Sequence, residues 1–409
     1  MELLKVDSLE KALEKLIDHS AALAVQTETI AVENSFGRII AEDVASAEDV
    51  PGFRRSTMDG YAVVATDTAG AGESMPVFLK IVGAVEMGED TALNLKAGQC
   101  AYVPTGAMIP EGATAVVMEE YCEKFSEDQL AIYQSVAEGT YVVLPDEDTV
   151  AGETILKKGR KIKAQDMGLL ASVGCTELKV YKPWNCYIIS TGDEVTDPAE
   201  PPQKGKVRDV NTYGLMGMAA SFGFKVKGYE RIHDEEKLLE EAVLRGKQVA
   251  DVVIVSGGSS KGRKDVTAKV LDKVSSSGVF THGIAVKPGK PTILAVDEPS
   301  NTVLVGLPGH PVAALIVFRQ IVGRLWQSKT CAEEELFTIA QIDTNLAASP
   351  GRTTFQLVKL QPSEAGMKAS PVLGKSGLIF NMSKADGYII IDRNLEGLKA
   401  GEKVKVYYI

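Results

Sequence analysis

The sequence predicts a multidomain α/β protein whose centre is a three-layer α/β domain with a parallel-rich sheet. Three apolar runs each end at a glycine-bearing turn, as buried strands do, at residues 186–190, 251–255 and 302–305. Helical patterns alternate with these runs between residues 180 and 330. Because parallel strands end at one edge of a sheet, we expect the turns that follow them to meet there around one ligand.

Several domains are expected, since 409 residues exceed what one hydrophobic core usually organises. An amphipathic helical pattern opens the chain at residues 7–17, and a second one covers 163–172. Short strand-like runs broken by Gly, Pro and Asp turns precede the α/β part, and alternating strands follow it. The expected domains are an N-terminal helical/linker domain (1–50 and 141–180), a β-rich lid module (51–140), the α/β domain (181–330) and a C-terminal small β-barrel (335–409).

Composition argues against several classes of protein. The formal net charge of -11 disfavours non-specific binding of nucleic acid. The five cysteines show no Cys-x-x-Cys spacing and no partnered histidines, so neither a zinc site nor a disulfide framework is expected. The segment after Met1 lacks the basic and apolar regions of a signal peptide, and no apolar run approaches the ~18 residues of a membrane span. We therefore expect a cytoplasmic protein with no membrane or nucleic-acid partner.

The first turn, at residues 190–194, places Asp193 and Glu194 at the end of a strand. Two such carboxylates can hold Mg²⁺ beside phosphates, because that ion takes one or two carboxylates and keeps several waters. The alternative is a plain turn in which Asp193 caps the next segment. Asp209 and Asn211, which precede a helical pattern, have the same two interpretations: helix cap or ligand contact.

The second turn is the most specific of the four, because a plain loop needs neither two successive glycines nor three cations. Flexible amides and hydroxyls are followed at once by positive charge in the run Ser256, Gly257, Gly258, Ser259, Ser260, Lys261, Arg263 and Lys264. This combination favours contact with a phosphate or another oxyanion. Asp265 is either the cap of the next helix or a further metal carboxylate.

The third and fourth turns also suit an anion. Lys287, Gly289 and Lys290 stand on a backbone stiffened by two prolines, with a solvated turn as the alternative. The fourth turn joins a strand to an apolar helix whose N-terminus can face an anion, and it contains Pro308, Gly309 and His310. His310 can bind, titrate or cap, and no partner in the sequence makes it a catalytic base.

The remaining polar segments give weaker signals. Arg54, Arg55 and Asp59 precede a strand in the β-rich module, and by themselves they indicate an exposed loop. The four histidines do not combine with serine, cysteine and aspartate into a convincing nucleophilic site.

Taken together, these motifs resemble the molybdopterin molybdenumtransferase family, the MoeA-like proteins related to the gephyrin E domain. The resemblance covers essentially the whole chain. The segments that match are 51–62, 104–110, 112–118, 190–194, 256–265, 283–291 and 306–312, with 374–377 and 385–388 near the C-terminus.

The resemblance implies transfer of molybdenum from molybdate to the dithiolene of adenylylated molybdopterin. It also implies Mg²⁺-dependent release of AMP and formation of active molybdenum cofactor. The implied assembly is an elongated homodimer of four-domain subunits, with a cleft between the α/β domain of one subunit and the β-rich module of the other. The adenylyltransferase that supplies the substrate and the apo-molybdoenzymes that receive the product are implied partners.

Carried over by the resemblance, the catalytic positions are Asp59, Thr105, Asp148, Glu194, Asp234 and Asp265, with Asp234 in the shortest match. Glu194 and Asp265 would lie near Mg²⁺ and the pyrophosphate, whereas Ser259, Ser260, Lys287 and Lys290 would lie near phosphate or molybdate. No protein nucleophile is required. Catalysis would consist of positioning and electrostatic neutralisation of the separating phosphates.

Two departures from the family pattern concern the substrate site. His310 stands where many members have Asn, and Arg54-Arg55 stands where Asp-Asn is common. One alternative activity is molybdopterin adenylylation, but those proteins usually have Gly-Gly-Thr-Gly in place of residues 257–260 and lack the flanking modules. A non-catalytic dimeric scaffold is the other alternative, against which the intact acidic set argues. The sequence leaves the choice between molybdate and tungstate open.

Overall fold

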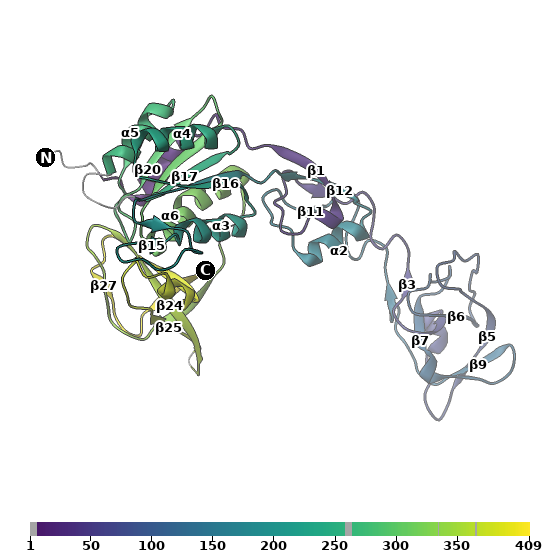
Figure 1. The fold of residues 1–409 in the computed structure, drawn as a ribbon. Helices are drawn as coiled ribbons and strands as arrows, with labels where there is room; N and C mark the ends of the chain where they lie inside the picture. Colours follow the sequence, from purple (N-terminus) through teal and green to yellow (C-terminus); the bar gives the residue numbers. More distant parts are fainter. Residues whose placement is uncertain (1–5, 258–263, 334, 365) are drawn as a thin grey trace.

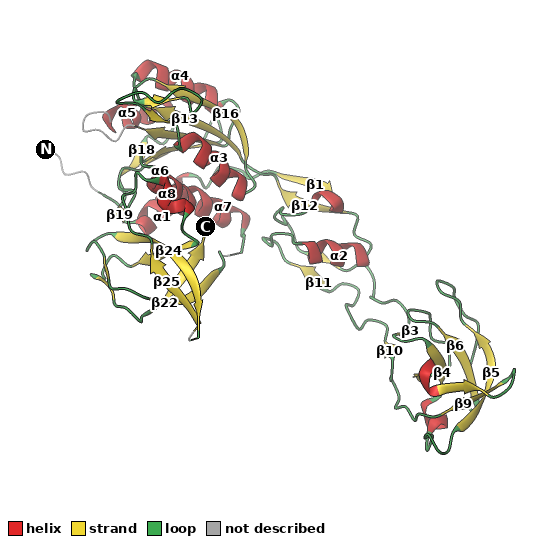
Figure 2. Ribbon diagram, turned by 60° about the horizontal axis from the view of Figure 1, so that its bottom comes forward, coloured by secondary structure: helices red, strands yellow, loops and turns green. Residues whose placement is uncertain are grey.

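The computed structural model describes residues 6–257, 264–333, 335–364 and 366–409. The chain is elongated (Figures 1 and 2). The α/β domain and the C-terminal β domain lie together at one end, a small linking domain lies in the middle, and the β-rich module lies at the far end. The predicted α/β multidomain fold class is confirmed.

The sheet of the α/β domain has six strands in the order β16-β13-β17-β21-β20-β18. The strands are β13 Asn185–Thr191, β16 Lys225–Ile232, β17 Val252–Gly257, β18 Val279–His282, β20 Ile293–Asp297 and β21 Thr302–Leu307. The first four in the sheet are parallel, and β20 is antiparallel to both of its neighbours. Strand β20 therefore begins at the edge where the parallel strands end, and the turn at residues 287–291 precedes it there.

Helices cover both faces of this sheet, which gives the predicted three layers (Figure 1). They are α3 Asn211–Ser221, α4 Glu236–Lys247, α5 Lys264–Val274, α6 Pro311–Phe318 and α7 Arg324–Thr330, with a π-helical turn, Arg319–Gly323, between the last two. Val253 and Val255 pack in one core cluster with Leu239 of α4, whereas Val252 and Ile254 pack in the cluster on the other face. This alternation is the period of a strand buried on both faces. No helix among the described residues is long and apolar enough to cross a membrane.

Helix α1, Leu9–His19, packs on the α/β domain. Its apolar residues Leu9, Ala12 and Leu16 belong to the same core cluster as α3 and α6. The preceding Asp7 donates its backbone N–H to the carbonyl of Gly283 at 3.2 Å. The α/β domain therefore covers the apolar face of α1, and the predicted domain boundaries stay a prediction.

The linking domain is built around a two-stranded antiparallel ribbon of β1, Thr27–Ala31, and β12, Glu177–Tyr181. Its other elements are the 3-10 turn Val32–Asn34, β2 Val44–Ala45, β11 Thr154–Leu156 and α2 Ala164–Ser172. At the start of α2, buried Asp166 accepts hydrogen bonds from Arg160 at 2.8 and 3.1 Å and from the Lys163 backbone N–H at 2.9 Å. Burial alone would raise the pKa of Asp166, but these bonds outweigh it and lower that pKa.

The β-rich module contains a six-stranded sheet in the order β7-β4-β6-β5-β9-β8. Its strands are β4 Gly60–Val63, β5 Val77–Ala84, β6 Gln99–Val103, β7 Ala115–Met118, β8 Cys122–Lys124 and β9 Gln129–Ile132, with 3-10 turns Ala65–Thr68 and Glu119–Tyr121. A short pair, β3 Arg55–Ser56 with β10 Val142–Val143, lies where the chain enters and leaves the module. Two small core clusters cover the two faces of the sheet.

The C-terminal region forms a closed five-stranded barrel, because β24 pairs with both β25 and β26. The elements are β22 Phe337–Ile342, β23 Leu346–Ala347, β24 Thr353–Ser363, β25 Gly366–Pro371, α8 Ile379–Ser383, β26 Gly387–Ile391, β27 Gly397–Leu398 and β28 Lys403–Tyr408. Strand β19, Val286–Lys287, adds to β24 from the α/β domain. The barrel is therefore attached next to the third glycine-bearing turn.

Candidate functional site

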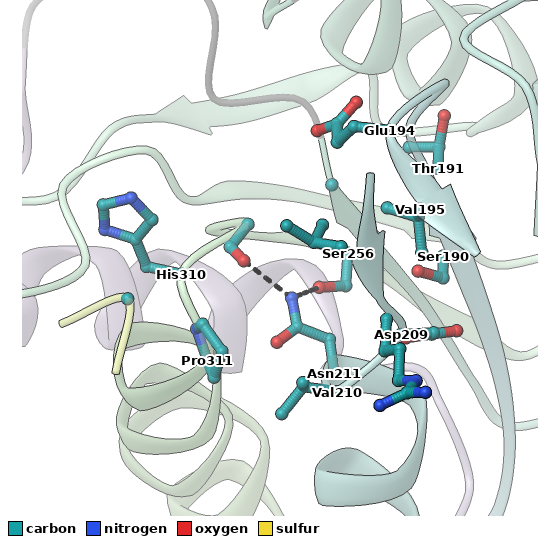
Figure 3. A pocket seen from close by; sticks show the side chains of 15 residues that line it. Ser190, Thr191, Glu194, Val195, Asp209, Val210, Asn211, Ser256, His310 and Pro311 are labelled. Carbon is teal, nitrogen blue, oxygen red and sulfur yellow. Dashed lines mark hydrogen bonds between the residues drawn. The ribbon is translucent and has the colours of Figure 1, made fainter. Parts of the chain in front are cut away.

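A pocket of about 400 Å³ opens at the edge where β13 and β17 end and α6 begins. Figure 3 shows Glu194 and Thr191 on one side of it and His310 and Pro311 on the other. The residues that line it are Ser190, Thr191, Glu194, Val195, Val207, Arg208, Asp209, Val210, Asn211, Ser256, Gly257, Gly309, His310, Pro311 and Gly377. The pocket thus brings together the first, second and fourth turns that the sequence analysis singled out.

The first two turns approach each other closely. Gly257 pairs with Thr191 across the parallel strands β17 and β13. A Cβ atom on Gly257 would lie 2.0 Å from the carbonyl oxygen of Thr191, so no other residue fits without a shift of the backbone. Glycine is required here for close approach, and the chain leaves β17 directly beside the acidic turn.

One buried side chain joins the second and fourth turns at the base of the pocket. Asn211, at the start of α3, donates from Nδ2 to Ser256 Oγ at 2.8 Å and to the Gly309 carbonyl at 2.9 Å (Figure 3). It is 9% exposed, and its Oδ1 has no hydrogen-bond partner among the described residues. The sequence indicated either a cap or a ligand contact for Asn211, and this connection between turns was missed.

Asp209 lines one wall of the pocket, and Arg231 contacts its carboxylate from behind that wall. Asp209 accepts from the Thr212 backbone N–H at 3.0 Å and from its hydroxyl at 2.7 Å, so it caps α3 as well as lining the pocket. Arg231 lies 3.5 Å from Asp209 and 2.8 Å from Asp197. Burial opposes the charge of Arg231, but its contacts with Asp197 and Asp209 together outweigh burial and raise the pKa of the guanidinium. The Ala199 backbone N–H and Arg231 lower the pKa of Asp197.

The acidic turn contacts the segment after β16. The Thr191 hydroxyl donates to Asp234 Oδ1 at 2.6 Å, and the Asp234 backbone N–H donates to Asp193 Oδ1 at 3.3 Å. His233 Nδ1 lies 3.2 Å from the same Asp193 oxygen. Asp234, which rested on the shortest sequence match, is therefore brought next to the first turn. Glu194 is exposed and lines the pocket.

The C-terminal domain contributes to the rim of the pocket. His310 Nδ1 lies 2.9 Å from Ser376 Oγ, the Val312 backbone N–H donates to the Ser376 carbonyl at 3.2 Å, and Gly377 lines the pocket. His310 also occupies the N-cap position of α6. Lys287 donates to Ser349 Oγ at 2.9 Å, which links the third turn to the same domain.

The predicted ligand-binding residues do not all line the pocket. Ser256, Gly257, Gly309 and His310 do, whereas the described residues Lys287, Gly289, Lys290 and Pro308 do not. Gly258, Ser259, Ser260, Lys261 and Arg263 lie outside the described residues, as does the side chain of Asp265 at the start of α5. Within the described part of the chain, no three His, Cys, Asp or Glu side chains gather to hold a metal ion. The predicted pair Glu194 and Asp265 thus stays a prediction.

Three predicted catalytic residues lie far from the pocket in this chain. The Asp59 carboxylate accepts the Thr105 backbone N–H at 2.7 Å, and both residues are exposed in the β-rich module. The Asp148 backbone N–H donates to the Val50 carbonyl at 2.9 Å, between that module and the linking domain. Figure 1 shows the module at the opposite end of the molecule from the α/β domain. The structure therefore joins Asp59 to Thr105 but not to Glu194.

Arg54 stays within its own module. Its guanidinium donates to the carbonyls of Ala113 at 2.8 Å and Pro110 at 3.3 Å. Arg55 is exposed on β3. Only one of the two positive charges noted in the sequence is therefore held by carbonyl groups of the module, and Arg55 presents its charge to solvent.

The fold and the pocket together define an α/β protein with a candidate ligand pocket at the carboxyl edge of a mostly parallel sheet. Three family models match the chain in succession. They are the MoeA N-terminal region (domain I and II) at residues 7–174, a probable molybdopterin binding domain at 187–327 and the MoeA C-terminal region (domain IV) at 340–409.

Whole proteins match as well. The molybdopterin molybdenumtransferase of Haemophilus influenzae is 30% identical over 405 residues, which cover 98% of each chain. Two crystal structures of the molybdopterin biosynthesis MoeA protein from Pyrococcus horikoshii are also similar. One shows 34% identity and a TM-score of 0.80 over 99% of both chains, and the other shows 26% identity and a TM-score of 0.83 over 99% of this chain and 100% of that chain.

The chain belongs to the MoeA family. Relatives across its whole length carry the name molybdopterin molybdenumtransferase, which places the protein among the transferases of molybdenum cofactor biosynthesis. The family resemblance drawn from the sequence is confirmed.

Proposed function

We propose that this protein inserts molybdenum from molybdate into adenylylated molybdopterin, with Mg²⁺-dependent release of AMP, to give active molybdenum cofactor. The observation that carries the proposal is the convergence of an acidic turn, a glycine-bearing turn and the N-terminus of α6 on one pocket. Such an edge supplies backbone N–H groups and a favourable helix end to a phosphate, next to carboxylates that hold a cation.

Within this proposal, the protein binds and orients charged groups. Ser256 and the following residues 257–263 would contact the pyrophosphate, and Lys287 and Lys290 would attract molybdate. Both lysines are exposed, and the contact of Lys287 with Ser349 holds its side chain toward the C-terminal domain. Catalysis would follow from positioning of the anions and from neutralisation of charge as the phosphates separate.

Glu194 is suited to Mg²⁺, because it presents an exposed carboxylate at the rim of the pocket. Asp265 at the start of α5 would supply the second carboxylate, in line with a cation that takes one or two of them. When bound, the ion would neutralise negative charge on the phosphate oxygens. Asp209 is less suited, since Thr212 and Arg231 already contact its carboxylate.

We further propose that the active form is a homodimer in which the β-rich module of one subunit faces the pocket of the other. The separation of Asp59 and Thr105 from Glu194 within one chain supports this arrangement (Figure 1). In it, the partner subunit's Asp59 would complete the charge of the site. The proposed setting is the cytoplasm, with an adenylyltransferase as the source of substrate and apo-molybdoenzymes as acceptors.

The test is release of AMP from adenylylated molybdopterin by the purified protein, with Mg²⁺ and molybdate, coupled to reconstitution of an apo-molybdoenzyme. Molybdate-dependent release together with reconstitution would support the proposal. Binding of the substrate without either outcome would favour a scaffold. Formation of adenylylated molybdopterin from ATP and molybdopterin would instead identify an adenylyltransferase. A reaction with tungstate in place of molybdate would define the choice of oxyanion.

A further inference from the structure

One wall of the pocket is a short parallel pair of strands, β14 (Val195–Thr196) and β15 (Val207–Arg208). Glu194 directly precedes β14, and its carbonyl accepts the Val207 backbone N–H at 2.8 Å. Residues from both strands line the pocket. The strand pair therefore fixes the position of the Glu194 backbone. Contacts that stabilise the pair also stabilise the position of Glu194.

At the other end of the pair, the side chain of Arg231 contacts the segments that follow the two strands. Asp197 follows β14 and Asp209 follows β15, and the guanidinium of Arg231 lies 2.8 Å from the first and 3.5 Å from the second. The Asp209 backbone N–H also donates to the Thr196 carbonyl at 2.9 Å. Arg231 lies on β16, where it pairs with Ser190 of β13, a residue of the pocket. The wall is thus attached to the main sheet through Arg231.

Burial makes the loss of this attachment costly. The side chain of Asp209 is 2% exposed, and that of Arg231 is 23% exposed. A buried carboxylate is costly unless it is paired and hydrogen-bonded, and Arg231 is the cation that faces Asp209 from the neighbouring strand. Asp197 is 42% exposed, and it accepts the hydrogen bond of the Arg231 guanidinium at 2.8 Å. Removal of the guanidinium would leave a buried charge at the end of the wall.

We propose that Arg231 is a positioning residue, which fixes the β14–β15 wall through Asp197 and Asp209 and thereby sets where Glu194 stands over the pocket. Arg231 itself does not line the pocket, so it acts through the wall and not on the substrate. This inference rests on the proposed function, because it assigns Arg231 a part in the reaction for which Glu194 is proposed.

The experiment compares Arg231→Met and Arg231→Lys with the wild-type protein. Hydrogen exchange of residues 195–209 without substrate reports the wall, and AMP release with adenylylated molybdopterin, Mg²⁺ and molybdate reports the reaction. We expect Arg231→Met to speed exchange in that segment and to lower kcat about 10- to 100-fold, with little change in KM, because small misplacement of a catalytic group has effects of that order. Arg231→Lys keeps the charge and is expected to recover part of kcat.

Arg245→Met is the matched control. Arg245 pairs with Glu230, the residue next to Arg231 on β16, at 2.6 Å, but it contacts neither Asp197 nor Asp209 in any described interaction. Exchange of residues 195–209 and kcat are expected to match the wild type. A loss of kcat in this variant equal to that of Arg231→Met would overturn the specific role of Arg231.

A double variant, Arg231→Met with Asp209→Asn, separates positioning from stability. Loss of the buried charge is expected to return Tm toward the wild-type value while kcat stays low. Recovery of kcat together with Tm would show a merely structural role and overturn the proposal, as would wild-type exchange or wild-type kcat in Arg231→Met. Absence of AMP release by the wild-type protein would instead contradict the proposed function, and the exchange result would still report whether Arg231 holds the wall.

Discussion

Glu194 and Asp59 are exposed carboxylates at opposite ends of the molecule, and their surroundings differ. Glu194 lies at the rim of a pocket. At its base Asn211 connects two turns, and behind one wall Arg231 contacts both Asp197 and Asp209. Asp59 lies on a short turn, where it accepts the Thr105 backbone N–H at 2.7 Å. Buried polar contacts thus support the pocket beside Glu194. Asp59 and Thr105, in contrast, form a small exposed group in the β-rich module.

Substitutions in the pocket and in the β-rich module therefore need different interpretations. At the pocket end, buried residues such as Asn211 and Asp209 support both the fold and the ligand site, so their replacement changes stability and function together. At the module end, Asp59 can be replaced with little effect on a core. The cleanest tests of function therefore use the exposed carboxylates, and the tests of architecture use buried pairs.

The largest effect is expected at Glu194. Glu194→Ala should lower kcat for AMP release by about 10²- to 10³-fold, the range observed when one electrostatic contact of a transition state is removed. Because Glu194 is exposed, Tm should stay close to the wild-type value. Kinetics and circular dichroism measure both quantities. Glu200→Ala, an exposed residue between β14 and β15, is the control, and near-normal kcat in Glu194→Ala would contradict the metal-binding role.

Asp59→Asn should lower kcat by about 10²-fold for the same physical reason. If the site combines two subunits, mixing Asp59→Asn with Glu194→Ala should recover about a quarter of wild-type activity, since half of randomly paired dimers are mixed and each contains one intact site. Asp67→Asn is the matched control for Asp59→Asn, because the Asp67 carboxylate also accepts a backbone N–H, that of Gly98 at 2.7 Å. Activity that stays absent after mixing would argue for a site within one chain.

A smaller effect is expected at Lys287. Lys287→Ala should weaken binding of molybdate and of adenylylated molybdopterin about 10-fold, since charge-assisted contacts contribute roughly 1.5–3 kcal/mol and exposure reduces this. Calorimetric titration gives the affinities. Ser349→Ala removes only the contact between Lys287 and the C-terminal domain, so it should retain most of the affinity. Equal affinities in wild type and Lys287→Ala would remove the lysine from the anion site.

The smallest effect on catalysis is expected from Asp166→Asn in the linking domain, which should instead lower the free energy of unfolding by about 3 kcal/mol. The pKa of Asp166 is lowered from 3.8, so its contribution is complete above that value and is lost as the pH falls through the folded-state pKa. Urea unfolding should show the full difference at pH 7 and a smaller one below about pH 4. The exposed pair of Asp43 and Lys157 provides a control, Asp43→Asn, with a small expected effect.

The α/β domain was the part most open to sequence analysis, because three of its strands, β13, β17 and β21, are apolar runs that end in glycine-bearing turns. Strand β16 was not predicted, since its sequence alternates charged and apolar residues at the edge of the sheet. The apolar helix expected after the fourth turn ends as α6 at Phe318 and continues as a π-helical turn. Local patterns do not show where a helix changes its hydrogen bonding.

The candidate site was less predictable, because its contacts join residues far apart in the chain. Asn211 is 45 residues from Ser256 and 98 from Gly309, and no pattern in the sequence connects them. An Asp-x-Asn pair ahead of a helix was the only available signal. The domain boundaries and the functional roles taken from family resemblance stay predictions, and they include the metal pair Glu194 and Asp265.

The ribbon of β1 and β12 lies between the α/β domain and the distant β-rich module (Figure 1). Two adjacent strands connect the linking domain to the α/β domain, next to the contact between the Lys182 backbone N–H and the Gln26 carbonyl at 2.8 Å. If the domains rotated about this ribbon, the displacement of an atom would grow with its distance from the ribbon, so the atoms of the β-rich module would move farthest (Figure 1). A change of a few degrees in the twist of this ribbon would therefore move Asp59 much farther than the ribbon itself, and it would not require a change in the pocket, which lies at the other end of β13.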